Sequence, residues 1–455
     1  MGGPEPAHGA RAGARLSVAV SLRQEATELL QALIRLDTVN PPGNETRAAE
    51  LLRSYLEENG VVCELYAKEP DRANLVARIP GSAGGPRLAL LSHTDTVLAD
   101  PAEWQVDPWS GELRDGEVWG RGALDMKGQV AASAVALASL AREGFKPTGD
   151  LIFVAAADEE VGVEVGLQWL VQAHPEAVRA EYSLNEGGGA VRPFEGRRVF
   201  GVCCAEKGVF RFTVTAEGVA GHASMPRMGD NAVLKLAPLI ERMREQPSFD
   251  LTEEPRALFE ALGEPAGGDP EAALERLRAR DPGLAFIIEP MLGVTITPTR
   301  LAASEKINVI PSRAQVQVDC RVPPGFGEAE TLARVEEVLG ADGYRLSFDE
   351  RVVGNRSAME GALMDAVREW VGEREPEATV VPVVLPGFTD SRWFRDSFPD
   401  CIAYGFCPQR HMTLYESAPL IHGADERIDV RDVGFAADFF DWLAKRMLGE
   451  EGGDG

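Results

Sequence analysis

Short apolar runs bounded by turn residues alternate with amphipathic segments along most of the chain. Apolar positions recur at helical spacing in 24–36, 46–59 and 127–142, whereas uniform apolar runs typical of buried strands occupy 74–79, 88–91 and 151–156. The first helix should end before Asn40-Pro41-Pro42-Gly43, because proline cannot continue a helical turn. Strands that alternate with helices predict a mostly parallel α/β sheet covered on both faces.

The pattern changes near residue 206. Strand-like segments at 209–214, 293–297, 314–320 and 344–348 and helical ones at 231–244 and 329–339 follow the approximate order βαββαβ. This order predicts an inserted two-layer α+β, ferredoxin-like domain. Helical and strand-like segments resume after residue 353, so we expect a discontinuous large domain at 21–205 and 353–447, an inserted domain at 206–352, and tails at 1–20 and 448–455. The stretch 247–282 is acidic and helical in pattern, and no role is assigned to it.

Composition and charge exclude several classes of function. The 455 residues, 44% hydrophobic and 26% charged, are typical of a globular protein of two domains. A formal charge of −26 without a basic stripe disfavours a nucleic-acid partner. No apolar run approaches the length of about eighteen residues that spans a membrane, and the run 16–22 does not resemble a signal peptide. Six cysteines without zinc-ribbon spacing are expected to be reduced thiols, and a cytoplasmic location is predicted.

Five short motifs carry side chains that can bind a metal, and four of them follow apolar runs. They are Ser92-His93-Thr94-Asp95, Ala123-Leu124-Asp125-Met126, Asp158-Glu159-Glu160, Asn185-Glu186-Gly187 and Ile421-His422-Gly423. Taken singly, each could be a strand cap, a helix N-cap or a solvated turn. In open α/β sheets, however, functional groups gather beyond the carboxyl ends of the strands. Imidazoles and carboxylates without a thiol favour an open catalytic site for zinc or a similar metal.

Charge balance supports the same interpretation. Three consecutive acids at 158–160 repel one another unless a cation compensates. Two divalent ions would be balanced by three ligand carboxylates and a bridging hydroxide, with both imidazoles neutral. Asp95, two residues after His93, is suitably near to hold the second nitrogen of the imidazole and so to orient the ring.

This ordered set of motifs resembles the co-catalytic zinc family that contains aminoacylase, acetylornithine deacetylase, succinyl-diaminopimelate desuccinylase and glutamate carboxypeptidase. The similarity extends from about residue 25 to 447. It implies a zinc-hydrolase catalytic domain with an inserted lid and dimerisation domain, and two Zn²⁺ ions, with Co²⁺ or Mn²⁺ as open alternatives. By resemblance, Asp125 bridges the two metals, His93 and Glu186 complete one site, and Glu160 and His422 complete the other. The peptide bond after Asp125 is expected to be cis.

The resemblance also implies catalytic and substrate-binding roles. Glu159 would be the general base that takes a proton from the metal-activated water and delivers it to the leaving amine. His222 resembles a lid histidine that reaches the oxyanion, often from the other subunit of a homodimer. The positions that match those near the carboxylate end of a substrate are Asn308, Arg321, Gly387 and Thr389. Their ordinary interpretations, as turn, surface ion pair or cap, stay open.

The expected activity is hydrolysis of an amide or peptide bond next to a carboxylate in a small molecule. Deacylation of an N-acyl amino acid and cleavage of a short peptide use the same chemistry, and the motifs do not distinguish them. The alternative is an inactive metal-binding scaffold or regulator, which Glu159 and His222 argue against because neither is needed to hold metal. A nucleotide-binding role is disfavoured because no G-x-x-x-x-G-K-[ST] motif is present.

Overall fold

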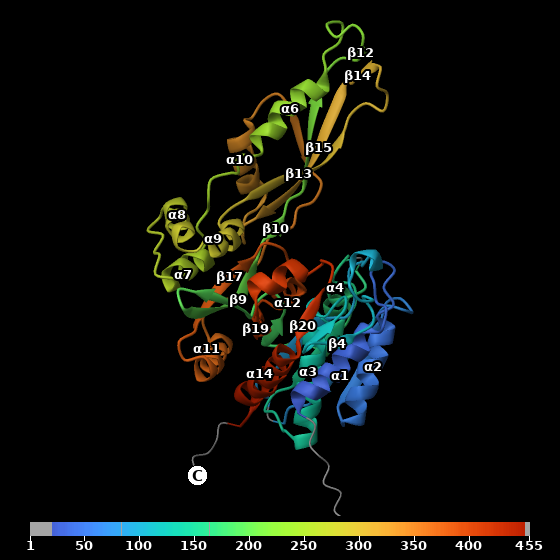
Figure 1. The fold of residues 1–455 in the computed structure, drawn as a ribbon, viewed down its shortest axis with the longest axis vertical. Helices are drawn as coiled ribbons and strands as arrows, with labels where there is room; N and C mark the ends of the chain where they lie inside the picture. The colour runs from blue at the N-terminus through green and yellow to red at the C-terminus, as the bar shows by residue number, and fades with distance from the viewer. Residues whose placement is uncertain (1–20, 83, 163, 451–455) are drawn as a thin grey trace, which may run out of the picture.

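The structure is a computed structural model that describes residues 21–82, 84–162 and 164–450. The predicted tail at 1–20 and the last five residues of the tail at 448–455 lie outside this range. Figure 1 shows an elongated molecule in which a smaller sheet-based unit lies at one end and a larger one at the other. Among the described residues, no helix combines the length and apolarity needed to cross a membrane.

The larger unit is built on a ten-stranded sheet in the order β1-β2-β6-β3-β7-β18-β9-β8-β19, with β17 paired to β9. Its strands are β1 (Val62–Ala67), β2 (Ala73–Ile79), β3 (Leu88–His93), β6 (Leu151–Ala156), β7 (Tyr182–Asn185), β8 (Ala190–Phe194), β9 (Arg197–Glu206), β17 (Thr379–Leu385), β18 (Ile402–Gly405) and β19 (Gln409–Thr413). The central pairs β6–β3, β3–β7 and β7–β18 are parallel, as are β9–β17 and β8–β19. The pairs β1–β2, β2–β6, β9–β18 and β8–β9 are antiparallel. The predicted mostly parallel α/β sheet is confirmed.

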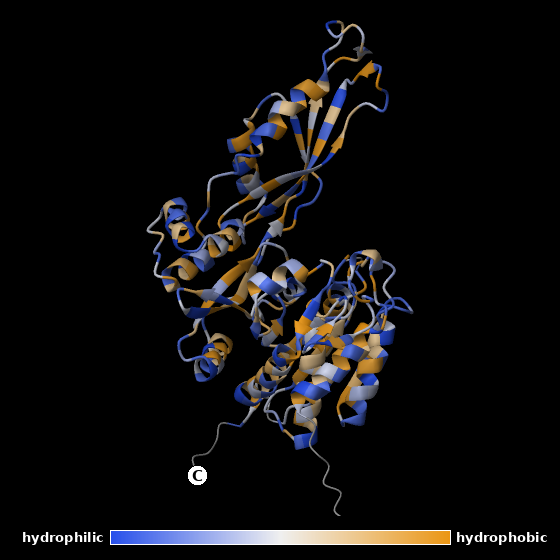
Figure 2. Ribbon diagram, in the orientation of Figure 1, coloured by the Kyte–Doolittle hydropathy of each residue, from blue (hydrophilic) through white to orange (hydrophobic). Residues whose placement is uncertain are grey.

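Helices cover both faces of this sheet, because its inner strands are apolar on both sides. Leu88 and Leu90 of β3 point into one core, whereas Ala89 and Leu91 point into another. The helices on the first face are α1 (Leu22–Ile34), α2 (Thr46–Glu58), α3 (Lys127–Glu143), α11 (Ala362–Arg374) and α14 (Val430–Leu448). Those on the second face are α4 (Leu167–Ala173), α5 (Pro175–Val178) and α12 (Ser391–Ser397). Figure 2 shows hydrophobic and hydrophilic residues interleaved along the outer helices, as amphipathic helices require.

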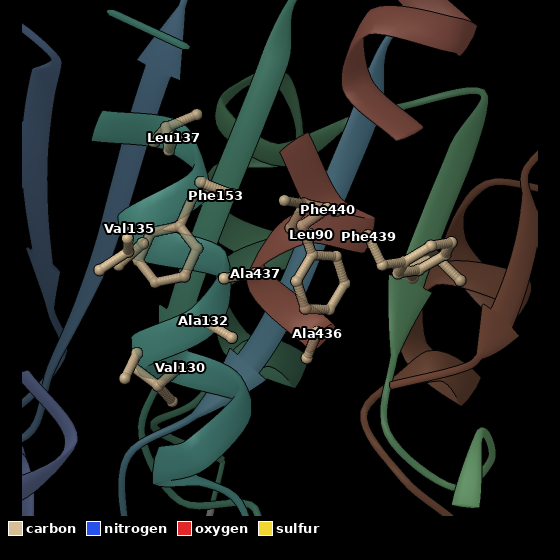
Figure 3. Packing of buried hydrophobic residues seen from close by; sticks show 14 of the residues in the cluster. Leu90, Val130, Ala132, Val135, Leu137, Phe153, Ala436, Ala437, Phe439 and Phe440 are labelled. Carbon is tan, nitrogen blue, oxygen red and sulfur yellow. The ribbon is translucent and has the colours of Figure 1, made fainter. Parts of the chain in front are cut away.

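Helix α3 is the central helix of the first face and is buried from Lys127 to Leu140. Its many alanines lack bulky side chains, so α1 and α14 can pack closely against it. Figure 3 shows side chains of α3 and α14 packed beside Leu90 and Phe153 of the sheet. The N-terminus of α3 is therefore held firmly at the edge of the sheet, directly after Asp125.

The smaller unit is an antiparallel sheet in the order β10-β15-β11-β16, with β13 beside β15. Its strands are β10 (Gly208–Val209), β11 (Phe212–Glu217), β13 (Thr295–Ala302), β15 (Arg313–Val322) and β16 (Arg345–Phe348), and its helices are α6 (Ala232–Arg242) and α10 (Glu328–Leu339). Both helices share one core with the sheet, which confirms the predicted two-layer α+β arrangement and its βαββαβ order. At the tip, β12 (Gly221–His222) pairs with β14 (Val309–Ile310).

The chain passes between the two units twice, and the two connecting segments lie side by side. Val209 pairs with Val352, and a Cβ atom added to Gly208 would lie 2.4 Å from the Val352 carbonyl oxygen. This close approach explains the glycine at 208. It also supports the predicted domain boundaries. We propose that the large domain consists of residues 21–205 and 353–447, and the inserted domain of residues 206–352.

The acidic stretch at 247–282 forms helices, as its pattern predicts. These are α7 (Glu253–Ala261) and α8 (Pro270–Arg280), followed by α9 (Pro282–Ile288). Their apolar residues, among them Leu258, Leu274 and Leu284, share a core with Val199 and Val383 of the large sheet. The insertion therefore covers β9 and β17 and does not join the core of the smaller unit.

The sequence pattern did not predict every element of the larger unit. A second, three-stranded sheet consists of β4 (Glu112–Arg114), β5 (Glu117–Trp119) and β20 (Arg427–Asp429). Its strands are too short to give a clear apolar period. Because β20 pairs with β5, the loop that carries His422 lies beside the glycine-rich loop that leads to Asp125.

Candidate metal centre

The structure brings together the five side chains predicted as metal ligands. His93, Asp125 and Glu186 form one group, and Asp125, Glu160 and His422 form another. Within each group the potential ligand atoms lie within 4.8 Å of one another, and Asp125 belongs to both. We refer to these five residues as the metal centre.

The topology of the large sheet accounts for this convergence. His93 is the last residue of β3, and Glu160 and Glu186 follow the ends of β6 and β7. These three strands are parallel neighbours, so their carboxyl ends meet at one edge. Asp125 reaches the same edge just before α3, and the β5–β20 pair brings His422 beside it. The peptide bond between Asp125 and Met126 is cis, as the resemblance implied.

Asp125 is the geometric centre of the cluster. Its Oδ1 lies 3.1 Å from Nε2 of His93, and its Oδ2 lies 3.2 Å from Nε2 of His422. Nε2 of His93 also lies 3.5 Å from Oε1 of Glu186, and Nε2 of His422 lies 3.2 Å from Oε2 of Glu160. One carboxylate that presents its two oxygens to two different imidazoles is suited to bridge two ions.

The electrostatics of the centre also fit cations. Burial, reinforced by repulsion from Asp125, raises the pKa of Glu186 to about 7. Hydrogen bonds to Asp125 and Glu160 raise the pKa of His422 to about 10. The raised pKa values favour the protonated forms of Glu186 and His422. Both side chains must lose a proton to bind a metal, and a divalent ion would displace these protons. Oε1 of Glu160 is buried without a hydrogen-bond partner among the described residues, and a cation would satisfy it.

Asp95 fixes the positions of His93 and of the turn that contains Glu159 and Glu160. The Nδ1 atom of His93 lies 3.1 Å from the Asp95 carbonyl oxygen and 3.4 Å from its Oδ1. The backbone amides of Glu159 and Glu160 each donate to the Asp95 carboxylate at 3.1 Å, and Asn40 donates to it at 2.9 Å. Burial favours the neutral acid, but these hydrogen bonds outweigh it and lower the pKa of Asp95. One buried carboxylate thus orients both the imidazole and the acidic turn.

Glu159 lies beside the centre without belonging to either ligand group. Its Oε2 is 4.0 Å from Nε2 of His93. Burial raises the pKa of Glu159 well above its ordinary value, and the negative charges of Glu186, Asp390 and Glu160 raise it further against the opposing effect of His93. A carboxyl group with a raised pKa next to the reacting atoms is suited to move protons near neutral pH.

Two acidic residues near the centre received no role from the sequence. Asp390 is buried, and burial raises its pKa well above the ordinary value. Glu426 is fully buried and accepts hydrogen bonds from the backbone amides of Gly122 at 3.0 Å, Leu124 at 2.7 Å and Asp125 at 3.0 Å. It also pairs with Arg121 at 2.7 Å. The only sequence signal for Glu426 was its position four residues after His422.

We expect Glu426→Gln to weaken metal binding about 10- to 100-fold, because it loosens the loop that positions Asp125. The free energy of unfolding should fall by about 3–5 kcal/mol, since Arg121 would keep a buried charge without its partner. Metal titration and denaturant unfolding measure the two effects. Glu58→Gln, on the exposed side of α2, is the control. Unchanged metal affinity in Glu426→Gln would show that the loop does not depend on this carboxylate.

The other predicted residues lie in two different places. His222 is exposed at the tip of the smaller unit, where its Nδ1 lies 2.7 Å from the hydroxyl of Ser224. Figure 1 shows β12 at the end of the smaller unit that points away from the larger unit. Asn308 is also exposed at this tip, and its carbonyl accepts from Ala223. Arg321, on β15, pairs with Asp319 at 2.7 Å. The structure therefore does not bring these three residues to the metal centre of the same chain.

The segment containing Gly387 and Thr389 lies in the larger unit. Apart from Gly387 itself and its two chain neighbours, no heavy atom lies within 4 Å of the Cβ position at Gly387, so the space beside this residue is open. Thr389 is buried, donates from its hydroxyl to Glu206 at 2.6 Å and accepts from Asn185 at 3.3 Å. Its hydroxyl is thus occupied within a buried network beneath the centre.

Known proteins are similar to this chain in sequence and in fold. The model of Peptidase family M20/M25/M40 matches residues 89–446. A succinyl-diaminopimelate desuccinylase from Rhodospirillum centenum is 34% identical over 423 residues, which cover 89% of this chain and 92% of the relative. An M20 family metallo-carboxypeptidase from Sulfolobus solfataricus is similar in structure, with a TM-score of 0.69 and 20% identity over 92% of this chain and 98% of that one. The YXEP protein of Bacillus subtilis, described as a dinuclear metal binding peptidase, gives a TM-score of 0.57 and 16% identity over 94% and 98%.

Proposed function

Because the chain belongs to Peptidase family M20/M25/M40, we propose that it uses two Zn²⁺ ions to hydrolyse an amide or peptide bond next to a carboxylate. The observation that carries the two-metal proposal is Asp125, whose two oxygens face the imidazoles of His93 and His422. The substrate class is an N-acyl amino acid or a short peptide, in line with relatives named as a desuccinylase and a carboxypeptidase. The six unpaired cysteines support the predicted cytoplasmic location.

The residues in and beside the centre would have different roles in catalysis. When bound, a metal pair supplies a water of lowered pKa and polarises the substrate carbonyl. His93, Asp125, Glu160, Glu186 and His422 would hold the pair. Glu159 accepts the proton of the attacking water on its carboxylate and then donates it to the leaving amine. Asp95 keeps His93 in position and fixes the backbone from which Glu159 extends.

A screen of N-acyl amino acids and dipeptides, with and without a chelator, tests the proposed activity. We expect the metal-loaded protein to release amine from at least one substrate of these classes, and the chelator to stop the release until metal is restored. Metal analysis of the same sample gives the number and identity of the ions. A protein that binds two ions and hydrolyses none of these compounds would favour the scaffold alternative.

We propose that His222 acts across a homodimer, because the tip that carries it lies at the opposite end of the smaller unit from the large sheet, whose strand ends carry the metal centre of the same chain. Exposed apolar side chains at the lid end of the molecule, including Met228, Leu234 and Ile307, are suited to contact a second subunit. In a closed dimer His222 would stabilise the oxyanion of the partner's substrate, and Asn308, beside it at the tip, would contact the same substrate. Arg321, Gly387 and Thr389 stay candidates for substrate binding.

Mixing two impaired variants tests this arrangement. Alone, His222→Ala should lose about 100-fold in kcat, the effect of removing one oxyanion donor, and Glu159→Gln should be nearly inactive. After subunit exchange, half of the dimers are mixed and each has one intact site, so activity should recover to about a quarter of the wild-type value. Mixing Glu159→Gln with Asp125→Asn is the control. Each of these changes damages the metal centre of its own chain, so a mixed dimer has no intact site and activity should not recover. No recovery in the first mixture would exclude action across subunits.

A further inference from the structure

A cavity of about 200 Å³ opens beside the metal centre, where Asp125 and Glu186 form part of its lining. The side chains of Leu124, Leu385 and Ile428 make its walls largely apolar. Glycines 187–189 also line it and contribute no side chains, which leaves the space open. A group bound here would be continuous with a substrate whose scissile bond lies at the metals.

Arg192, on β8, is the one basic residue among those that line this cavity. Only 7% of Arg192 is exposed, and its Nε and Nη1 atoms are buried without a hydrogen-bond partner. The ion pairs between described residues include none from this guanidinium. Its Nη2 lies 3.9 Å from the Cβ position of Gly201, another residue of the lining. We refer to this space as the Arg192 pocket.

The fold gives other buried arginines an acidic partner, so the isolation of Arg192 requires an explanation. Arg72 pairs with Glu45 at 2.6 Å, Arg121 with Glu426 at 2.7 Å, and Arg395 with Glu206 at 3.4 Å. An unpaired buried charge is costly, and proteins normally compensate it. Burial lowers the pKa of the Arg192 guanidinium to about 10, so it remains positive at neutral pH. An anion is the kind of partner that would compensate this charge.

We propose that the Arg192 pocket selects a substrate arm that ends in a carboxylate, which Arg192 binds while the apolar walls contact the methylene groups. The planar fork of a guanidinium matches a carboxylate in a bidentate pair. One cation balances one negative charge, and the lining offers no second basic side chain that a phosphate dianion would require. The arm can be a terminal carboxylate on the acyl group or an acidic side chain of a peptide.

Binding to metal-free protein tests the pocket without any catalytic step. With a chelator present, glutarate should bind the wild type at least about tenfold more tightly than it binds Arg192→Met, the loss expected for a charged hydrogen bond. The neutral diamide of glutarate should not distinguish the two proteins. Arg198→Met, which removes an exposed arginine from the neighbouring strand β9, is the matched control. Equal glutarate binding by the wild type and Arg192→Met would overturn the proposal.

The stability of Arg192→Met separates ligand binding from a structural role. Without ligand, the variant should be at least as stable to denaturant as the wild type, because an unpaired buried charge has been removed. Added glutarate should then stabilise the wild type and not the variant. A ligand-free Arg192→Met that is clearly less stable would show that Arg192 has a partner within the fold, and would overturn the proposal.

Kinetics with metal-loaded enzyme identify which part of the substrate carries the arm, and this step rests on the proposed function. N-glutaryl and N-pentanoyl amino acids test the acyl group, and dipeptides with Glu or Gln test the side chain. For the acidic member of one pair, Arg192→Met should lose about 100-fold in kcat/KM, with the neutral member little changed. An equal loss on both members would overturn the inference. If no compound is hydrolysed but glutarate binding still requires Arg192, the proposed function fails and the pocket stands.

Discussion

Replacing Glu159 with glutamine is expected to lower kcat by about 10⁴-fold while the protein keeps two bound metal ions per chain. The carboxylate lies 4.0 Å from His93 and outside both ligand groups, so its loss should remove proton transfer and leave metal binding intact. Glutamine keeps the size of the side chain but cannot accept the proton of the attacking water. Both quantities are measured on the same sample. The turnover rate tests the loss of kcat, and the metal content tests whether two ions remain bound.

Glu164→Gln is a matched control, because Glu164 lies in the same loop and is exposed. It should keep both full activity and full metal content. A Glu159→Gln enzyme that stays within tenfold of the wild type would remove Glu159 from the mechanism. A variant that loses metal as well as activity would instead make Glu159 part of the metal-binding site.

The sheet and the metal centre could be predicted because their signals are local. Strands β3 and β6 contain uninterrupted apolar runs, at 88–91 and 151–156, and such a run needs neighbours on both faces wherever they come from. The ligands His93 and Glu160 follow these runs, Glu186 follows the short strand β7, and the parallel strands bring their ends to one edge. Convergence of these residues thus follows from the alternating pattern of helices and strands.

The supporting residues could not be predicted, because their roles depend on contacts between distant segments. Glu426 holds backbone amides near Asp125, about 300 positions away, and nothing near Glu426 in the sequence indicates that contact. Arg192 precedes a proline in a short strand, a context typical of an exposed edge. Its burial arises only because β8 lies between β9 and β19 and beside the cavity. The distance between His222 and the metal centre depends on how the two domains are placed, which motifs do not specify.

Asp125→Asn should have the largest effect on metal binding, since Asp125 alone belongs to both ligand groups. An amide carries no negative charge, and its nitrogen would face one of the two metal sites without a lone pair to offer. We expect metal content to fall below one ion per chain under conditions that give two in the wild type, with activity lost. Zinc should also stop stabilising the variant, whereas zinc at 100 times its Kd stabilises a binding protein by about 2.7 kcal/mol.

His422→Ala and Glu186→Ala distinguish a shared ligand from two independent sites. Each removes a side chain from one group only, so each variant should keep one tightly bound ion. Mass spectrometry for metal content measures this difference, and circular dichroism establishes that all three variants are folded. If Asp125→Asn keeps one ion as firmly as these two variants do, Asp125 serves a single site and the bridged pair is excluded. If His422→Ala loses both ions, the two positions bind metal cooperatively and the division of the ligands into two groups is wrong.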